Sequence, residues 1–140
     1  MAEIALLDAG PLVALLDRSD ADHTWASDKL KDLHAPLHSC AAVIGEAMFV
    51  LRRCHAASDQ LRTLLDRGLI LPVTEDAALW ARALTLMKRY ENVPMSFDDA
   101  CLVAISETQE ETRIFTLDRD FLIYRRNERE VLSLLSPFES

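Results

Sequence analysis

The sequence contains little of what a disulfide scaffold, a structural zinc site or a membrane protein needs. Its 140 residues include only three cysteines and four histidines, and neither set shows the spacing of zinc ligands. Because Cys40, Cys54 and Cys101 each lie in an apolar helical context, we expect all three to be buried free thiols. No stretch reaches the ~20 apolar residues that a membrane-spanning helix needs.

The chain also lacks a basic, apolar leader and an excess of positive charge. Glu3 stands near the start and Asp8 closes the first apolar run, so we expect a cytoplasmic protein with no membrane partner. The 15 Lys and Arg residues against 23 Asp and Glu residues give a net charge of −8, which by itself disfavours phosphate binding. Acids gathered around bound cations would be offset by those cations, however, so the net charge does not exclude a nucleic acid partner.

No Pro/Gly/Ser-rich linker, internal repeat or low-complexity tract divides the chain, which has three glycines and five prolines. Half of its residues are hydrophobic, and a chain of this length can bury a substantial core. We therefore expect a single domain spanning residues 1–140.

The hydrophobic pattern predicts strands that alternate with helices. Strands are expected at residues 4–7, 37–39, 69–73, 113–117 and 130–135. Helices are expected at 12–16 after a break at Gly10-Pro11, at 19–33 after a capping box that starts at Ser19, at 40–54, at 58–67 before Gly68, at 75–89 after a Thr74 cap, and at 96–107. This alternation predicts an α/β fold, a three-layer α/β/α domain with a parallel sheet of about five strands.

Four acidic residues occupy positions where an isolated carboxylate is costly. Asp8 ends the run Ile-Ala-Leu-Leu, Glu46 interrupts an apolar helix, Asp99 opens another helix, and Asp118 follows Ile-Phe-Thr-Leu. No Lys or Arg lies within four residues of the first three, so nothing local neutralises them. If the first and penultimate strands are neighbours, the aspartates converge at the carboxyl ends of the strands and Glu46 projects in from its helix. The sequence thus predicts one shared site that holds a cation.

Each of these acids also has an ordinary structural role open to it. Asp99 can complete a capping box, Asp118 can cap the short helix that follows it, and Asp8 can make an Asx-turn. Glu46 has no capping role, and its alternative is a buried ion pair with Arg53 on the same helix face. Explaining all four acids separately requires four coincidences, so we favour the shared site.

The ligand set indicates which cation is bound. Carboxylate oxygens with no cysteine or histidine suit Mg²⁺ or Mn²⁺, as one or two ions, better than zinc. Asp98 adds a carboxylate beside Asp99 and leaves the assignment between them open. Asp120 is a weaker candidate, as an outer ligand or only as a cap.

These residues resemble the motifs of PIN-domain ribonucleases, particularly toxins of the VapC type. The segment from Leu6 to Asp17, with Asp22-His23 after it, resembles the first motif, and Glu46 falls where the helical glutamate is expected. Residues 93–107 resemble the third motif, and residues 114–121 with Tyr124-Arg125 resemble the fourth. The chain departs from the family at Ala9-Gly10, because many members carry Thr or Ser directly after the first Asp, so a hydroxyl near the metal is missing.

The resemblance implies a divalent-metal-dependent endoribonuclease that serves as the toxin of a type II toxin-antitoxin pair. Asp8, Asp99 and Asp118 would hold the metal, with Glu46 as a direct or water-mediated ligand that orients the attacking water. Hydrolysis by metal-activated water would leave 5′-phosphate and 3′-hydroxyl ends. The resemblance also implies a homodimer and a cognate antitoxin, whose basic residue enters the acidic pocket.

An RNA substrate would need cations around the acidic centre. Several arginines flank the motifs, and the candidates are Arg53 and Arg119, followed by Arg52, Arg125 and Arg126, although arginine runs are more often solvated surface. Thr116 could hydrogen-bond a carboxylate or a phosphate, or it could simply be a β-branched strand residue.

Two other functions fit parts of the pattern. A non-catalytic PIN-like binding scaffold would keep the acids without the activity. A receiver-like phospho-acceptor domain shares the length, the doubly wound fold and the acids. That fold requires an aspartate after the third strand, however, and the third predicted strand here leads to Pro72-Val-Thr-Glu75.

Overall fold

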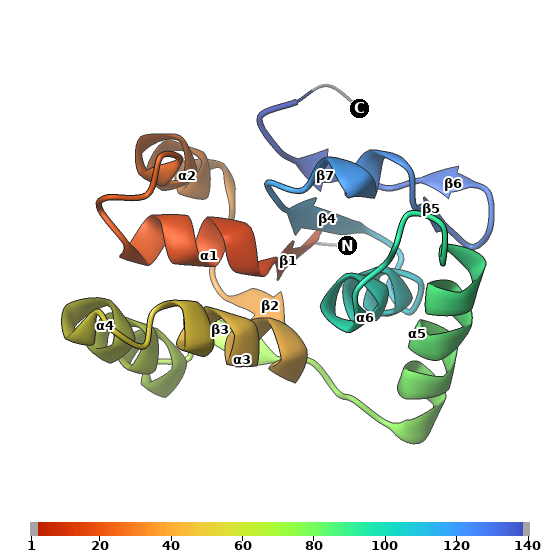
Figure 1. Cartoon of the computed structure of the whole chain (residues 1–140), viewed down its shortest axis with the longest axis horizontal. Helices are drawn as coiled ribbons and strands as arrows, with labels where there is room; N and C mark the ends of the chain where they lie inside the picture. The colour runs from red at the N-terminus through yellow and green to blue at the C-terminus, as the bar shows by residue number, and fades with distance from the viewer. Residues whose placement is uncertain (1–2, 139–140) are drawn as a thin grey trace.

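A five-stranded parallel sheet forms the middle layer of the computed structural model, which describes residues 3–138 (Figure 1). The sheet order is β3-β2-β1-β4-β7, which places the first strand at the centre. The strands are β1 (Ile4–Leu7), β2 (Leu37–Ser39), β3 (Ile70–Pro72), β4 (Thr112–Phe115) and β7 (Leu134–Leu135). The predicted three-layer α/β/α fold is confirmed, and β1 and β4 are neighbours, as the shared site requires.

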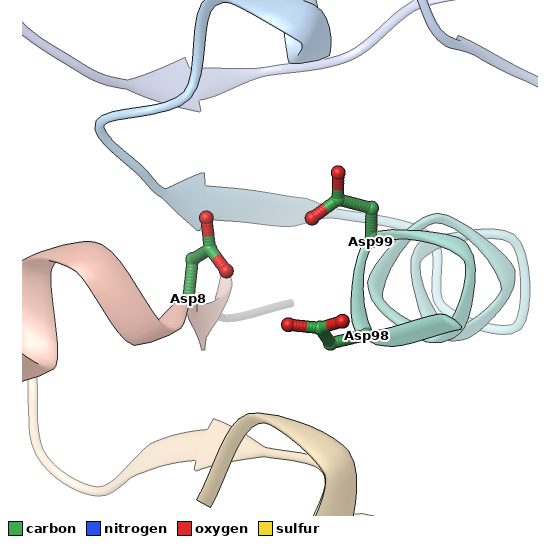
Figure 2. Close-up of side chains that lie close together, drawn as sticks. All are labelled: Asp8, Asp98 and Asp99. Atoms are coloured by element: carbon green, nitrogen blue, oxygen red, sulfur yellow. The ribbon is translucent and has the colours of Figure 1, made fainter. Parts of the chain in front are cut away.

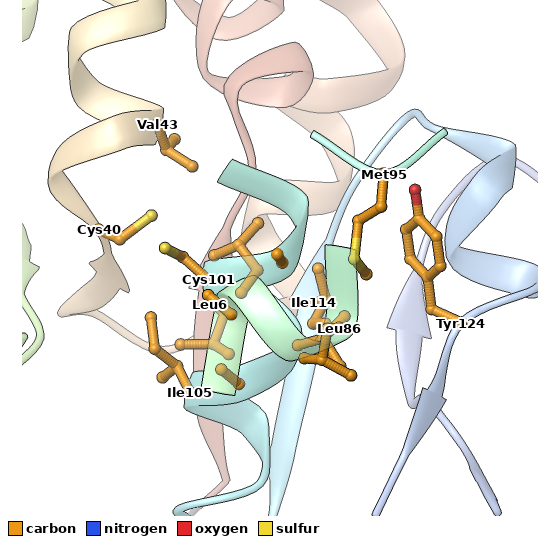
Figure 3. Packing of buried hydrophobic residues seen from close by; sticks show 14 of the residues in the cluster. Leu6, Cys40, Val43, Leu86, Met95, Cys101, Ile105, Ile114 and Tyr124 are labelled. Carbon is orange, nitrogen blue, oxygen red and sulfur yellow. The ribbon is translucent and has the colours of Figure 1, made fainter. Parts of the chain in front are cut away.

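Helices cover both faces of the sheet because the side chains of β1 alternate between two apolar cores. Leu6 belongs to a core built largely by α5 and α6, part of which is shown in Figure 3. Ala5 and Leu7 belong to a core built with α1 and α4. The helices are α1 (Ala9–Leu16), α2 (His23–Lys29), α3 (Ala41–Val50), α4 (His55–Asp66), α5 (Ala77–Arg89) and α6 (Phe97–Ser106), with short 3₁₀ segments η1 (Leu30–Asp32) and η2 (Arg119–Leu122).

The first helix begins earlier than predicted. Helix α1 starts at Ala9, directly after β1, with Asp8 as its N-cap. The expected break at Gly10-Pro11 is therefore wrong. Pro11 lies in the first turn, where a missing backbone N–H costs no helical hydrogen bond. As a result the first acidic residue lies at the junction of a strand and a helix.

Other helix boundaries were also wrong, in two cases because a cap was misassigned. The Ser19 capping box does not form, since the Ser19 hydroxyl donates to Asp17 at 2.6 Å and α2 begins only at His23. Helix α3 ends at Val50 rather than at residue 54, and α4 begins at residue 55 rather than 58. The cap of α5 is Asp76, whose side chain accepts from the Leu79 N–H at 2.8 Å, instead of Thr74.

The predicted strand 130–135 is two strands in different sheets. β6 (Glu130–Val131) pairs antiparallel with β5 (Arg125–Arg126), which was not predicted. Only β7 joins the main sheet, beside β4. Asn127 and Glu128 in the connecting turn have φ of 49° and 72°.

The cysteines divide into a buried pair and an exposed residue. Cys40 and Cys101 are buried as predicted, whereas Cys54 is exposed. The prediction for Cys54 was wrong because α3 ends before it, which leaves this residue in the turn to α4. Within residues 3–138, no helix combines the length and apolar character needed to cross a bilayer.

Two glycines are expected to respond oppositely to alanine. Gly68 follows α4 with φ of +70°, as predicted for a glycine beyond a helix end, so Gly68→Ala should lower the free energy of unfolding by about 1 kcal/mol. Gly45 lies within α3, and a Cβ there would meet nothing within 4 Å, so Gly45→Ala should raise it by up to ~1 kcal/mol. Urea denaturation of both variants measures the difference. Effects of the same sign in both variants would contradict this account of the two glycines.

Candidate metal centre

The predicted acids meet at the carboxyl edge of the sheet. Asp8 directly follows β1, and Asp118 lies just beyond β4, so the parallel pairing of these strands brings them to the same edge. Asp98 and Asp99 lie in the first turn of α6. Figure 2 shows Asp8 facing these two aspartates across a short gap. One carboxylate oxygen from each of Asp8, Asp98 and Asp99 lies within 4.8 Å of the others.

An open cleft of about 660 Å³ contains this cluster. All four acids that the sequence singled out line it. The charged lining residues are Asp8, Asp20, Glu46, Asp98, Asp99, Asp118 and Arg119. Sequence reasoning treated Asp20 only as part of a capping box, because it lies in a polar turn where an acid has no unusual feature. Asp98, a weaker prediction, belongs to the tightest group.

Asp8 is buried, and each of its carboxylate oxygens accepts one hydrogen bond. One carboxylate oxygen accepts from the Ala9 N–H at 2.8 Å, and the other accepts from the Thr116 hydroxyl at 2.7 Å. Burial raises the pKa of Asp8 to about 6, helped by repulsion from Asp98 and Asp118, although both hydrogen bonds act in the opposite direction. The fold thus holds a carboxylate that is costly to ionise unless a cation approaches it.

Thr116 ties two of the acids together. Its buried hydroxyl donates to Asp8 and also accepts from the backbone N–H of Asp118 at 3.0 Å. Thr116 was predicted to hydrogen-bond either a carboxylate or a phosphate, and in the structure its partner is the carboxylate of Asp8. This side chain sets the position of Asp8 relative to the loop that carries Asp118.

Asp99 is held by a tyrosine from the segment that follows η2. The Tyr124 hydroxyl donates to an Asp99 oxygen at 3.1 Å, and the Asp99 backbone N–H donates to the Ser96 hydroxyl at 3.2 Å. Burial, and then repulsion from Asp8 and Asp118, raise the pKa of Asp99 to about 7. Sequence reasoning placed Tyr124 in a motif but gave it no role, because no local signal shows where a phenol points in the core.

Glu46 differs from its prediction in one respect. It is exposed on α3 rather than buried in an apolar helix. Contact with the Asp98 carboxyl group, then desolvation and the charges of Asp98 and Asp8, raise the pKa of Glu46 to about 7. In the described part of the chain, no ion pair joins Glu46 to Arg53. The glutamate therefore faces the acidic cluster instead of its predicted alternative partner.

Asp120 and Arg119 occupy different positions relative to the cleft. The Asp120 backbone N–H donates to an Asp118 oxygen at 2.9 Å, which makes Asp118 the cap of η2, and the Asp120 side chain does not line the cleft. Desolvation and the charge of Asp118 raise the pKa of Asp120. Arg119 lines the cleft, and its guanidinium lies 5.1 Å from the centre of the Phe138 ring.

The other arginine candidates lie outside the lining of the cleft. Arg53 is exposed in the turn after α3. Arg52 stacks at 4.0 Å over the Phe49 ring. Arg125 donates to backbone carbonyls of the preceding turn. Arg126 donates to the carbonyls of Ser106, at the end of α6, and of Gln109, just beyond it. Arg119 is thus the predicted arginine that the structure brings to the acids.

The comparisons with known proteins agree with this fold. The family model described as PIN domain matches residues 5–127. A structure of VapC20 from Mycobacterium tuberculosis, a sarcin-ricin loop cleaving toxin, superposes with a TM-score of 0.74 at 22% identity, covering 83% of this chain and 91% of that chain. A toxin-antitoxin complex from Klebsiella pneumoniae gives a TM-score of 0.71 at 18% identity, covering 97% and 99%. VapBC2 from Rickettsia felis, bound to promoter DNA, gives 0.63 at 12%, covering 95% and 98%. Comparison with curated protein sequences gave no significant match.

Without added metal, the free energy of unfolding should fall as the pH rises from about 4 to about 8. Asp8 and Asp99 have folded-state pKa values of about 6 and about 7. In this window the folded state therefore binds more protons than the unfolded state, and stability is lost as the pH rises. Asp8→Asn should raise stability at the upper end by about 2 kcal/mol and flatten the dependence.

Urea denaturation in a chelator, across this pH range, measures the effect. Asp59→Asn is the matched control, because Asp59 is exposed on α4 and outside the cleft, and it should follow the wild-type slope. If the stability of the wild-type protein rises with pH, or if Asp8→Asn leaves the slope unchanged, the raised pKa values of Asp8 and Asp99 are refuted.

Proposed function

The chain belongs to the PIN-domain family, and we propose from its cleft that it is a divalent-metal-dependent endoribonuclease, the toxin of a type II toxin-antitoxin pair. One observation carries the proposal: oxygens of Asp8, Asp98 and Asp99 lie within 4.8 Å of one another in an open cleft. The lining of this cleft has six carboxylates and one arginine. Such a site is complementary to a cation and to a charged substrate that brings or shares that cation.

The donor set fits a hard divalent cation. Its ligands are carboxylate oxygens, which Mg²⁺ and Mn²⁺ prefer, and no cysteine or histidine lines the cleft. Burial, with repulsion from neighbouring acids, raises the pKa of Asp8 and Asp99, and contact with Asp98 raises that of Glu46, so counter-charge would relieve a real cost. When bound, one or two ions would lower the pKa of a water molecule and stabilise negative charge on the phosphate.

The protein's own residues then have distinct roles. Asp8, Asp98 and Asp99 supply the nearest ligand oxygens, and Asp118 supplies a further one from the loop after β4. The Thr116 and Tyr124 hydroxyls fix the orientation of Asp8 and Asp99, so these side chains are positioned before metal arrives.

Glu46 and Arg119 act on the substrate side of the cluster. Glu46 faces Asp98 from the exposed side of α3 and orients the attacking water, taking its proton at a carboxylate oxygen. Arg119 offers the cleft a cation for a phosphate oxygen. Attack by water forms no 2′,3′-cyclic phosphate. Departure of the 3′-oxygen, as the resemblance to the family implies, gives a 5′-phosphate and a 3′-hydroxyl.

A cleavage assay tests the proposal directly. Purified protein with Mn²⁺ should cut structured RNA, and Asp8→Asn and Glu46→Gln should each reduce the rate by roughly 100-fold or more, because they remove a ligand or the base. Glu110→Gln is the matched control, since Glu110 is exposed and outside the cleft. End-mapping should find 5′-phosphates.

Three outcomes would contradict the nuclease. An Asp8→Asn protein that cuts RNA at the wild-type rate would exclude this site. A wild-type protein that binds a partner peptide but not Mn²⁺ in calorimetry would be a non-catalytic scaffold. A stable phosphoryl-aspartate after treatment with acetyl phosphate would indicate the receiver-like alternative.

The proposed partners are RNA, a cognate antitoxin and a second copy of the chain, all in the cytoplasm. The Klebsiella pneumoniae relative is a toxin-antitoxin complex, and an acidic cleft suits a basic residue of such an inhibitor. An apolar strip at the end of α3 supports self-association, because Met48, Phe49 and Val50 are 49%, 64% and 52% exposed.

Self-association through this strip can be tested by measuring the molar mass of the protein in solution. Phe49→Glu should shift the protein from dimer to monomer in light scattering, because burying a carboxylate in an apolar interface is costly. Val131→Glu is the control, since Val131 on β6 is equally exposed at 63%. A wild-type monomer at high concentration, or a dimer that persists in Phe49→Glu, would refute the role of α3.

A further inference from the structure

Two cysteines outside the acidic cleft face one another between α3 and α6. Cys40 is the N-cap of α3, and Cys101 lies in the second turn of α6. Their relative exposures are 1% and 0%. Figure 3 shows the two sulfurs pointing toward each other across the interface, and each thiol is the largest influence on the pKa of the other. Residues 40 and 101 are far apart in the sequence, so the fold brings them together.

One member of this pair borders open space. Although Cys40 is buried, it lines a groove of about 420 Å³ along α3, together with Ser39, Gly45 and Glu75, so a reagent as small as peroxide has a route to its sulfur. Contact with the Cys101 thiol lowers the pKa of Cys40, and the thiolate is the reactive form of cysteine. Cys101, by contrast, has no part in the lining of that groove. The arrangement gives one sulfur that can be attacked first and a second that lies next to it.

We propose that Cys40 and Cys101 form an oxidisable dithiol, a site at which hydrogen peroxide produces a disulfide between α3 and α6. The Cys40 sulfur attacks one peroxide oxygen, the O–O bond breaks, and a sulfenic acid and one water form. The Cys101 sulfur then attacks the Cys40 sulfur, the S–O bond breaks, and the second water leaves with the Cys101 proton. The two thiols lose two electrons and two protons in total, and peroxide is reduced to water.

The bond would connect the two helices that carry cleft carboxylates. Cys40 precedes Glu46 by six residues on α3, and Cys101 follows Asp99 by two residues on α6. A link across so long a loop restricts the unfolded chain, so the oxidised form should melt roughly 5 to 10 °C higher than the reduced form. The inference does not depend on the nuclease activity.

Peptide mapping tests the proposal with the intact protein. Trypsin cleavage after Lys and Arg places the three cysteines in separate peptides, residues 32–52, 54–62 and 90–113. After treatment of the reduced protein with peroxide and alkylation in denaturant, peptide 32–52 should be linked to 90–113. Reduction with dithiothreitol should release both.

Variants separate this pair from the exposed thiol. Cys54→Ser should keep the link and the rise in melting temperature, whereas Cys101→Ser should abolish both and leave a sulfenic acid on Cys40 that dimedone traps. Links that involve only peptide 54–62, or full alkylation of Cys40 and Cys101 after peroxide, would overturn the proposal. Mapping of the wild-type protein decides the matter even if Cys101→Ser does not fold.

Discussion

The burial of mutually repelling carboxylates at one edge of a parallel sheet is the constraint on which this structure depends. Asp8 lies at the end of the central strand, where burial and neighbouring charges raise its pKa to about 6. The fold offsets part of this cost with donors aimed at the acids, from Thr116, Tyr124 and the start of α1. The remaining cost is what a bound cation, as proposed above, would relieve. A core built for stability alone would place apolar side chains there.

The ordinary structural roles of these acids and the shared site are not competing explanations. Asp8 caps α1, Asp118 caps η2, and the N–H of Asp99 is capped by Ser96. Each cap fixes the backbone at the end of a helix and thereby aims the carboxylate. The local hydrogen bonds that explain each acid as an ordinary helix cap also orient the carboxylates toward one another.

Much of this arrangement was predictable because it follows from strand ends. Strand β1 was placed to the residue, and the aspartates after β1 and β4 followed from the parallel pairing. Features that depend on packing were not predictable. The exposure of Glu46 follows from which face of α3 meets the two cores, and the contact of Tyr124 with Asp99 joins positions 25 residues apart. The β5–β6 hairpin was missed because its two-residue strands carry no periodic signal.

The bond from Thr116 to Asp8 spans 108 positions of the sequence, and it has a consequence for synthesis. Asp8 leaves the ribosome early, but its hydroxyl donor Thr116 and the partner strand β4 follow only near the end of translation. Contacts of such wide separation are made late, since the whole intervening chain must close first. A nascent chain therefore has no assembled cleft until it is almost complete.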